Sequence, residues 1–328
     1  MSGPVAIEVL EVVDGGVEAT IQDAGRPNAA RLGVPPGGAC DPMGLAIANV
    51  LVGNACDRPA LEVFLGGTAL RALVELTLGV GGGDLGLVRG TGERVEPGEA
   101  ISVTAGDALR FTGGPDARAY LAVPGGFVGE RVLGSVSTLV AAGFGGHGGR
   151  VLAGGDRLAA PVPALLPEPL PWPTTGGPSR RHEVRILRGP HARPAGGSLE
   201  ALTGGAWRVA SADRMALRLD GPPIDTGTVE LPSHGVTFGT IQLPADGRPI
   251  VLLADHQTTG GYPVIAVAIS ADRSVLAQLR PGDDVTFRPV SLADAVAALR
   301  ALREALAAGE RAVREAAAWD DLWRSAQG

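Results

Sequence analysis

Glycine and proline occur so often along this chain that they constrain its fold more than any other feature. The sequence holds 50 glycines and 26 prolines among 328 residues, which is just below the share typical of low complexity. Helices tolerate both residues poorly, so turns and short strands are expected instead. The hydrophobic fraction of 45% nevertheless predicts a folded protein, and the length is ample for a sizeable buried core.

Short apolar segments predict β-strands on both sides of the middle of the chain. They carry valine, isoleucine, leucine and phenylalanine, and glycine, proline or aspartate closes most of them. The segments are 100–103, 108–111, 119–123, 183–187, 250–253, 264–269 and 285–290. Many short strands and few helices favour β-barrels over a βαβ sandwich.

Two stretches share an internal pattern. Residues 101–111 and 276–287 both run from an apolar segment through a Gly-Asp pair to a second segment that ends at phenylalanine. This pattern predicts a Gly-Asp hairpin in each of two barrels. The glycines of 79–86 look like a phosphate-binding loop, but no clear strand-turn-helix pattern surrounds them, so a barrel turn is expected there.

Two helices stand out. Asp41 followed by Pro42 predicts the start of a helix over 43–51, because a capping aspartate and a proline at the first helical position favour an N-terminus. The tail from 291 to about 326 has apolar residues at three-to-four-residue spacing, interrupted at Gly309. It predicts a helix that packs one face onto a barrel or a partner subunit.

Proline is densest at 161–178, where it fills seven of eighteen positions. Such a segment favours extended geometry and acts as a semi-rigid connector. The predicted division is an N-terminal β-barrel domain at 1–160, a proline-rich linker at 161–181, a C-terminal β-barrel domain at 182–290 and a helical tail at 291–328.

All 28 basic residues are arginines, and the formal net charge is −7. Without lysine the chain cannot form a Schiff base, has no phosphate-loop lysine and cannot itself carry biotin or lipoate. The mild acidity argues against a nucleic-acid partner.

Cys40 and Cys56 form neither a disulfide framework nor a metal set, which suits a reducing cytosol. The five histidines show no zinc-binding spacing, so no metal site is expected. No apolar run is long enough to span a bilayer, and no charged-then-apolar leader begins the sequence. We therefore expect a cytoplasmic protein that contacts no membrane.

Gln22, Asp23 and Arg26 place an amide, a carboxylate and a guanidinium within five residues. A glycine-rich stretch follows and ends at Asp41, and its glycines let backbone amides approach a ligand closely. These four residues are therefore candidates for substrate binding. The alternative is that Asp23 pairs with Arg26 and only holds a long loop in place.

A second polar segment, 255–263, follows the apolar strand at 250–254. Its side chains surround a Gly-Gly pair and suit a small polar ligand or an oxyanion; a tight capped turn is the alternative. A third segment, 211–215, contains Asp213 and Arg214, which could position a substrate carboxylate or brace the second barrel. The last two segments lie in the second half of the chain and the first lies in the other, so we expect a site between the halves.

Six motifs occur together in a characteristic order. They are Thr-x-Gln-Asp-x-Gly-Arg at 20–26, Gly-Val-Pro-x-x-Gly-Ala-x-Asp at 33–41, Gly-Gly-x-x-Gly-Arg at 145–150, Asp-Arg-Met at 213–215, Gly-x-Ile-Gln-x-Pro at 239–244 and Gln-Thr-Thr-Gly-Gly-Tyr-Pro at 257–263. Over roughly residues 5–290 the chain thus resembles the biotin-dependent carboxyltransferase family typified by the C subunit of 5-oxoprolinase. That family was formerly labelled allophanate hydrolase subunit 2, or antagonist of KipI.

The resemblance implies a mainly β protein with two cyclophilin-like β-barrel domains, few helices and a C-terminal helical tail. It implies a complex with a homologous B-type, KipI-like protein and a larger A-type protein, which uses ATP to hydrolyse 5-oxo-L-proline to L-glutamate. One alternative is a carboxyltransferase subunit that moves a carboxyl group from carboxybiotin to urea or a related amide. Another is a non-catalytic regulatory partner of the kinase-inhibitor-like subunit. No cofactor is expected to be covalently bound, and any biotin would lie on another chain, since this one has no lysine.

For lactam hydrolysis we expect Asp23 or Asp255 to transfer protons. The groups expected to hold the oxyanion or the carboxylate are Gln257, Thr258, Thr259 and the amides of Gly260 and Gly261. The other expected substrate-binding residues are Gln22, Arg26, Asp41, Asp213, Arg214, Gln242 and Tyr262. The chain departs from the family pattern at Val136 and Val264, where members commonly carry a cation.

Overall fold

The structure is a computed structural model that describes residues 6–161, 172, 182–192, 197–225 and 231–327, with side chains as far as residue 315. The chain divides into two compact units. Unit 1 consists of Met1–Gly25, Asp41–Gly176 and Glu304–Gly328, and unit 2 of Arg26–Cys40 and Gly177–Arg303. Apart from Pro161 and Trp172, the predicted linker at 161–181 lies outside the described residues.

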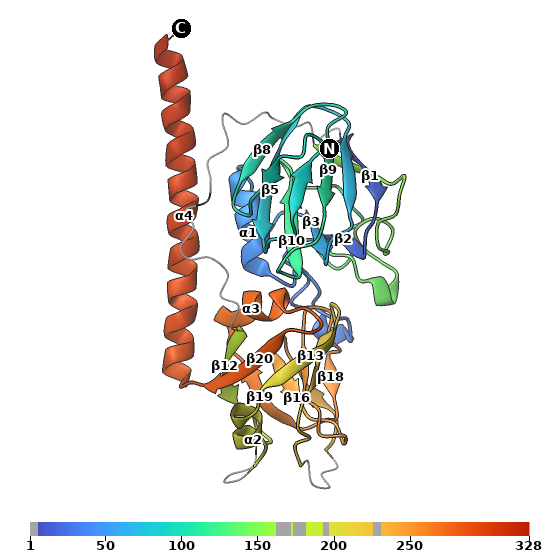
Figure 1. The fold of residues 1–328 in the computed structure, drawn as a ribbon, viewed down its shortest axis with the longest axis vertical. Coiled ribbons are helices and arrows are strands. Elements are labelled where there is room, and N and C mark those ends of the chain that lie inside the picture. The colour runs from blue at the N-terminus through green and yellow to red at the C-terminus, as the bar shows by residue number, and fades with distance from the viewer. Residues whose placement is uncertain (1–5, 162–171, 173–181, 193–196, 226–230, 328) are drawn as a thin grey trace. The chain divides into compact units, whose positions relative to one another are not determined.

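Unit 1 is built from two antiparallel sheets (Figure 1). The first contains, in spatial order, β11 (Arg157–Pro161), β1 (Ala6–Asp14), β4 (Ala69–Ala72), β9 (Ala108–Phe111), β6 (Leu87–Arg89) and β7 (Arg94–Val95). The second contains β2 (Glu18–Gln22), β3 (Ala60–Phe64), β10 (Arg118–Ala122), β5 (Leu76–Gly82) and β8 (Ala100–Val103).

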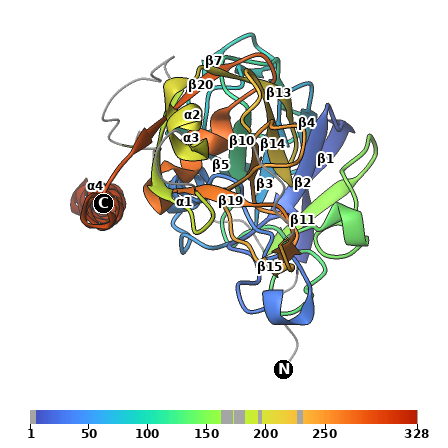
Figure 2. The same ribbon diagram turned by 90° about the horizontal axis from the view of Figure 1, so that it is seen from below.

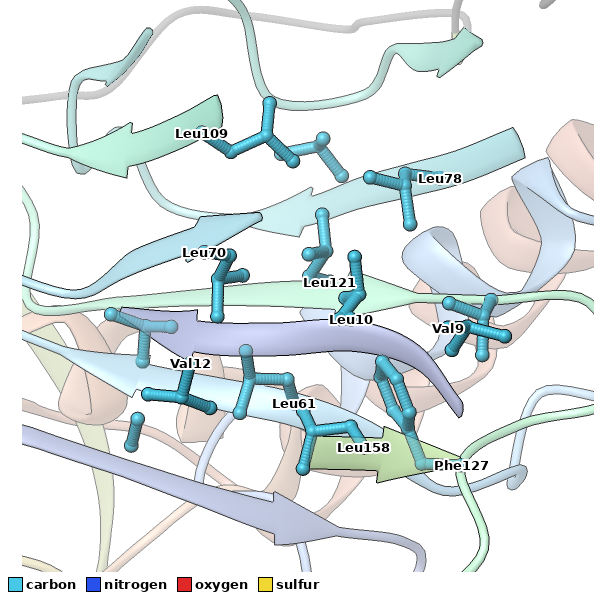
Figure 3. Packing of buried hydrophobic residues seen from close by; sticks show 14 of the residues in the cluster. Val9, Leu10, Val12, Leu61, Leu70, Leu78, Leu109, Leu121, Phe127 and Leu158 are labelled. Atoms are coloured by element: carbon cyan, nitrogen blue, oxygen red, sulfur yellow. The ribbon is translucent and has the colours of Figure 1, made fainter. Parts of the chain in front are cut away.

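One hydrophobic core takes side chains from both sheets of unit 1. Leu10 and Leu70 come from the first sheet and Leu61 and Leu121 from the second, and each is at most 1% exposed. Figure 3 shows these leucines gathered in one packed cluster. Burying a leucine side chain fully contributes about 1.5–3 kcal/mol, so this core is what holds the two sheets together.

Helix α1 (Pro42–Leu51) lies beside β5 in both Figure 1 and Figure 2. It starts as the sequence predicts, because Asp41 Oδ1 accepts hydrogen bonds from the backbone N–H groups of Met43 at 3.1 Å and Gly44 at 3.0 Å. Two of the four N–H groups that a helix start leaves without partners are thereby satisfied.

The glycines of 79–86 begin inside strand β5, so the expected barrel turn is wrong for Gly79 and Gly81. A Cβ at Gly79 would lie 2.2 Å from the carbonyl oxygen of Ala48, and one at Gly81 would lie 2.1 Å from that of Gly44. Only glycine fits where the strand and α1 approach so closely. These glycines therefore serve helix–sheet packing.

Unit 2 contains a closed seven-stranded barrel. Its strands follow one another as β12 (His182–Arg188), β19 (Val264–Ala268), β16 (Thr240–Gln242), β17 (Ile250–Leu252), β14 (Ala216–Asp220), β13 (Trp207–Ala212) and β20 (Asp284–Pro289). Parallel pairing of β20 with β12 closes the ring. A separate pair is formed by β15 (His234–Gly235) and β18 (Thr259–Gly260).

The remaining elements are helical, and all of them except α4 are short. They are α2 (Ser198–Gly204), α3 (Arg273–Gln278), α4 (Leu292–Gln327) and the 3-10 turns Ala30–Leu32, Val140–Ala142 and Ser270–Asp272. Sheets, a closed barrel and a C-terminal helix confirm the predicted mainly β class. No helix among the described residues is long and apolar enough to cross a membrane.

All seven predicted strands are present and agree within one residue at each end. The predicted Gly-Asp hairpins are wrong. Strands β8 and β9 flank the first Gly-Asp pair but belong to different sheets, and residues 276–278, before the second pair, are helical. A Gly-Asp turn determines how the chain reverses locally, whereas the partner of each strand is set by the packing of the core.

Helix α4 passes through Gly309 without a break, contrary to the expected interruption. It is seen along its length in Figure 1 and end-on in Figure 2. Gly309 is buried, and a Cβ at this position would lie 2.2 Å from Cζ2 of Trp172. The glycine makes room for an aromatic ring in unit 1.

Candidate functional site

Unit 2 holds a pocket of about 580 Å³ on the outer face of its barrel. Ala216, Arg218 and Asp220 of β14 line the pocket, as does the core residue Leu219, whereas Leu217 belongs to the barrel core alone. Successive residues of a strand point to opposite faces, which places the pocket outside the barrel.

Two glutamines form a polar part of the pocket wall. Gln257 Nε2 donates a hydrogen bond to Gln242 Oε1 at 3.1 Å, and Gln242 is 1% exposed. Within the described part of the chain, Gln242 Nε2 has no hydrogen-bond partner. A buried donor in this state costs about 1–3 kcal/mol, so the position suits an acceptor that arrives with a ligand.

The loop after Gln257 is shaped around this amide. A Cβ at Gly260 would lie 2.5 Å from Gln242 Nε2, so glycine leaves the space that the amide occupies. Tyr262 is 49% exposed and lines the same pocket. Of the residues predicted from sequence, the structure thus brings Gln242, Gln257 and Tyr262 together.

Thr258, Thr259 and Gly261 follow Gln257 in the same segment but are not part of the described pocket wall. Thr259 and Gly261 are exposed, and the carbonyl oxygen of Thr258 accepts a hydrogen bond from Val236 N at 3.2 Å.

Part of the pocket wall is apolar. Ala216, Ile250 and Leu252 line the pocket and pack in one cluster with Val264, which is 4% exposed. The position at which family members commonly carry a cation is therefore part of a hydrophobic cluster in this protein.

His191 contacts this region at the backbone of Val264. Its Nδ1 accepts a hydrogen bond from Val264 N at 3.0 Å, and its ring centroid lies 4.9 Å from that of His234. Burial, and secondarily the neighbouring His234, lower the pKa of His191 below its usual value. Both effects disfavour a positive charge on His191.

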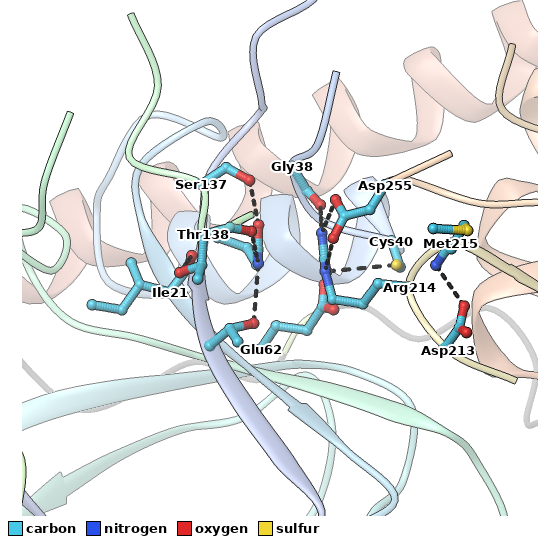
Figure 4. Close-up of polar contacts among 12 residues, drawn as sticks. Ile21, Gly38, Cys40, Glu62, Ser137, Thr138, Asp213, Arg214, Met215 and Asp255 are labelled. Carbon is cyan, nitrogen blue, oxygen red and sulfur yellow. Dashed lines mark hydrogen bonds and ion pairs between the residues drawn. The ribbon is translucent and has the colours of Figure 1, made fainter. Parts of the chain in front are cut away.

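Arg214 and Asp255 form a buried ion pair within unit 2 (Figure 4). Arg214 Nε and Nη2 donate to the two carboxylate oxygens at 2.9 and 3.1 Å, and Nη2 also donates to the carbonyl oxygen of Gly38 at 2.6 Å. A two-pronged pair fixes both side chains in one geometry. It also anchors the segment that carries Gly38 to the barrel.

Asp213 takes no part in that pair. Its Oδ1 accepts a hydrogen bond from Met215 N at 2.6 Å, drawn in Figure 4, and another from Ala216 N at 2.8 Å. Asp213 and Arg214, which the sequence predicted to act together, thus make two separate contacts. Of the two alternatives, this geometry favours bracing of the barrel.

In unit 1, Gln22 is fully buried at the end of β2. Its Nε2 donates to Thr20 Oγ1 at 3.0 Å and to the carbonyl oxygen of Thr138 at 3.2 Å, and its Oε1 accepts from Ser137 Oγ. Both N–H groups of this amide are therefore used inside the protein.

Asp23 is similarly engaged. Its carboxylate accepts hydrogen bonds from Gly25 N at 2.8 Å, from Val136 N at 2.6 Å and from Ser135 Oγ. The Val136 side chain is 3% exposed and belongs to the core of unit 1. At this second departure from the family pattern, it is the backbone of Val136 that contacts the carboxylate.

The other two candidates of the N-terminal motifs lie in different units. Asp41 belongs to unit 1, where it caps α1. Arg26 belongs to unit 2, is 2% exposed, and its backbone N–H donates to the carbonyl oxygen of Pro36 at 2.7 Å. The expected site between the halves stays a prediction.

His256 is not among the site residues predicted from the sequence, but the structure places it beside Gln257 with only 3% of it exposed. Its Nδ1 lies 2.6 Å from the carbonyl oxygen of Gln257. Burial is the main cause that lowers the pKa of His256, and Arg273 adds to it, against the opposing effects of the Gln257 contact and Asp255. Among the described residues, no three His, Cys, Asp or Glu side chains gather as a metal site.

Arg218 and Arg248 were also missed, and both line the pocket. Neither belongs to a motif. Alternation along 216–220 could have found Arg218, because it places residues 216, 218 and 220 on the face opposite the core.

Residues 32–289 match the family model described as carboxyltransferase domain, subdomain A and B. The chain belongs to this family. The resemblance predicted from the six motifs is therefore confirmed. Among curated proteins, the C subunit of the 5-oxoprolinase of Haemophilus influenzae is 35% identical, covering 88% of this chain and 93% of its own length. The corresponding C subunit of Escherichia coli is also 35% identical, with 88% and 94% coverage.

Solved structures extend this likeness to the fold. The chain matches the urea carboxylase of Kluyveromyces lactis with a TM-score of 0.83 at 28% identity, covering 94% of this chain and 30% of that one. It matches TTHA0988 with a TM-score of 0.79 at 34% identity and 86% coverage. This chain spans 55% of the TTHA0988 chain, so it corresponds to only part of these larger proteins.

Proposed function

We propose that this chain is one component of an ATP-dependent 5-oxoprolinase complex that hydrolyses 5-oxo-L-proline to L-glutamate. The 35% identity to the two C subunits, over nearly their whole length, supports the proposal. The structural observation that carries it is the buried amide of Gln242, which lines the pocket and lacks a hydrogen-bond acceptor within the described part of the chain. A lactam carbonyl is such an acceptor.

Lactam hydrolysis develops negative charge on the carbonyl oxygen as water adds and the C–N bond breaks, so a donor at this oxygen lowers the barrier. In the proposal Gln242 donates from Nε2, and Gln257 holds it in orientation through their 3.1 Å hydrogen bond. The apolar side chains of Ile250 and Leu252 pack against the carbon atoms of the ring.

Proton transfer by Asp255 or Asp23 remains part of the proposal. Arg214 contacts both oxygens of Asp255, and three donors surround Asp23. Either carboxylate would exchange one of these contacts for a proton. Replacing each with asparagine separates two roles. If the carboxylate is structural, the substitution lowers the free energy of unfolding. If it transfers protons, the substitution lowers kcat while the stability of the protein is unchanged.

We also propose a homologous B-type, KipI-like protein and a larger A-type protein as partners in a cytoplasmic complex, with ATP used by the complex. Support comes from the relatives, whose names describe them as subunits. The other predicted binding residues stay predictions: Gln22, Arg26, Asp41, Asp213, Arg214, Thr258, Thr259, Gly260, Gly261 and Tyr262.

The test is to co-express the chain with the homologous subunits of the same genome and to measure ATP-dependent glutamate release from 5-oxo-L-proline. Gln257→Ala should lower turnover while the complex still assembles. Loss of assembly alone would instead favour a non-catalytic regulatory partner. A well-formed wild-type complex that releases no glutamate contradicts the proposal.

The second candidate function is carboxyl transfer from carboxybiotin to urea or a related amide. The TM-score of 0.83 with a urea carboxylase favours it, and the Gln242 amide would equally serve the carbonyl of urea. Because the chain has no lysine, biotin would be carried by another polypeptide. Carboxylation of urea by the complex from bicarbonate and ATP, with a biotinylated partner and no glutamate release, would support this function.

A further inference from the structure

Arg218, Ile250 and Gln242 form one row across three neighbouring strands. Arg218 of β14 lies opposite Ile250 of β17, and Ile250 lies opposite Gln242 of β16. Residues directly opposite each other in antiparallel strands point to the same face. All three line the pocket, so the row runs along its wall.

The row sets the spacing of the two polar groups. Neighbouring strands lie about 4.8 Å apart, so the backbones of Arg218 and Gln242 are separated by about 10 Å. Ile250 fills the position between them and gives that position an apolar surface. A small ligand lying over Ile250 therefore meets an amide donor on one side and a guanidinium on the other.

The guanidinium of Arg218 is available to bind a ligand in this wall. The Arg218 side chain is exposed and makes no ion pair or hydrogen bond among the described residues. Arg248, the other arginine of the pocket, lies 3.5 Å from Asp220, and its backbone N–H donates to Asp246 Oδ1 at 3.0 Å. Both acids that line the pocket thus have contacts of their own.

We propose that Arg218 binds a carboxylate group of the substrate while Gln242 binds its amide carbonyl. The pocket then takes small amides or lactams that carry a carboxylate in preference to uncharged ones. Planar guanidinium groups match carboxylates with two parallel hydrogen bonds. In 5-oxo-L-proline the carbonyl and the carboxylate flank the ring nitrogen on its two sides, which matches the order of groups along the row. This inference rests on the proposed function, because it adds which group of the lactam substrate the same pocket recognises.

The test has a binding arm on the full-length chain and a kinetic arm on the complex. Calorimetry compares 5-oxo-L-proline with 2-pyrrolidinone, the same lactam without its carboxylate. Wild type should bind 5-oxo-L-proline at least 10-fold more tightly, and Arg218→Gln should remove that preference. Arg208→Gln is the matched control, because Arg208 is an exposed arginine of β13 outside the pocket wall and pairs with Asp284 at 3.0 Å. It should bind like wild type.

In the complex, Arg218→Gln should raise KM for 5-oxo-L-proline at least 10-fold, with a smaller change in kcat, and Arg218→Lys should restore part of the loss. Unchanged KM in an active Arg218→Gln complex overturns the role of Arg218 and leaves the proposed function standing. Carboxylate-dependent binding that Arg218→Gln abolishes, in a complex without 5-oxoprolinase activity, supports the site and contradicts the proposed function. A wild-type chain with no preference between the two lactams overturns the inference.

Discussion

Gln257 Nε2 donates a hydrogen bond to Gln242 Oε1 at 3.1 Å, and this contact leaves the nitrogen of Gln242 facing no acceptor in the described structure. A buried donor without an acceptor lowers the free energy of unfolding of the protein. Groups held in this way are candidates for ligand contacts, because the ligand supplies the missing partner. The contrast with Gln22, whose amide donates two hydrogen bonds inside the protein, makes the idea testable.

Gln242→Leu should change stability by less than about 1 kcal/mol, because removing a buried N–H group without a partner offsets the lost hydrogen bond from the partly exposed Gln257. The same change should lower glutamate release by the complex about 100-fold or more, since a donor to the developing oxyanion is lost. Urea unfolding and the glutamate assay check the two effects. Gln22→Leu, the matched control for stability, should cost about 1–3 kcal/mol. Equal destabilisation by both changes would contradict this view of Gln242.

Arg214→Met should destabilise unit 2 by about 3–5 kcal/mol, because it leaves the Asp255 carboxylate buried without its cation. The Asp255 side chain is only 11% exposed. Urea unfolding followed by tryptophan fluorescence, to which Trp207 in the core of unit 2 contributes, measures the loss. Arg214→Met/Asp255→Leu should recover most of it, since neither charge then remains. If the folded double variant is also active in the complex, Asp255 transfers no proton.

The pKa of His256 lies below the ordinary value of 6.5, chiefly because the ring is buried. Protonation therefore favours the unfolded chain, and His256 contributes stability that is present above pH 6.5 and lost as the pH falls from there towards its folded-state pKa. Denaturant unfolding between pH 7.5 and 5 should show this fall. His256→Gln should flatten the curve, leaving the part that His191 contributes in the same direction. An unaltered pH dependence in His256→Gln would refute the assignment.

Gly309→Ala should weaken the attachment of α4 in unit 1, although alanine normally stabilises a helix by about 1 kcal/mol relative to glycine. The new Cβ would lie 2.2 Å from the Trp172 ring and would displace it. Hydrogen exchange of α4 around residue 309 should become faster. Gly309→Ala/Trp172→Ala removes the obstructing ring and should allow alanine its usual effect. Slower exchange in the single variant would show that the ring is not fixed there.

Local patterns predicted the elements whose start is determined by neighbouring residues. Helix α1 is an example, because Asp41 caps its first turn and Pro42 takes its first position. The strands were found for the same reason. The roles of Gly81 and Gly309 were not predictable, because each glycine is required by a distant group, the Gly44 carbonyl or the Trp172 ring.

The same distinction applies to the candidate site. Gln242 and Gln257 belong to motifs, and the structure joins them in one pocket. Asp213 and Arg214 are adjacent in sequence, but the turn sends them to different partners. Arg218 resembles any exposed strand arginine until the register places it in line with Gln242. Strand pairing, which sequence patterns do not specify, is what identifies it.

The central claim is that this chain serves lactam hydrolysis, and the products of the purified complex test it most directly. The complex should be supplied with ATP and either 5-oxo-L-proline or urea with bicarbonate, and glutamate and carboxylated urea should be measured in parallel. We expect ATP-dependent glutamate from 5-oxo-L-proline, strongly reduced by Gln242→Leu, and no carboxylation of urea. Carboxylated urea without any glutamate would contradict the claim and identify the chain as a carboxyltransferase subunit.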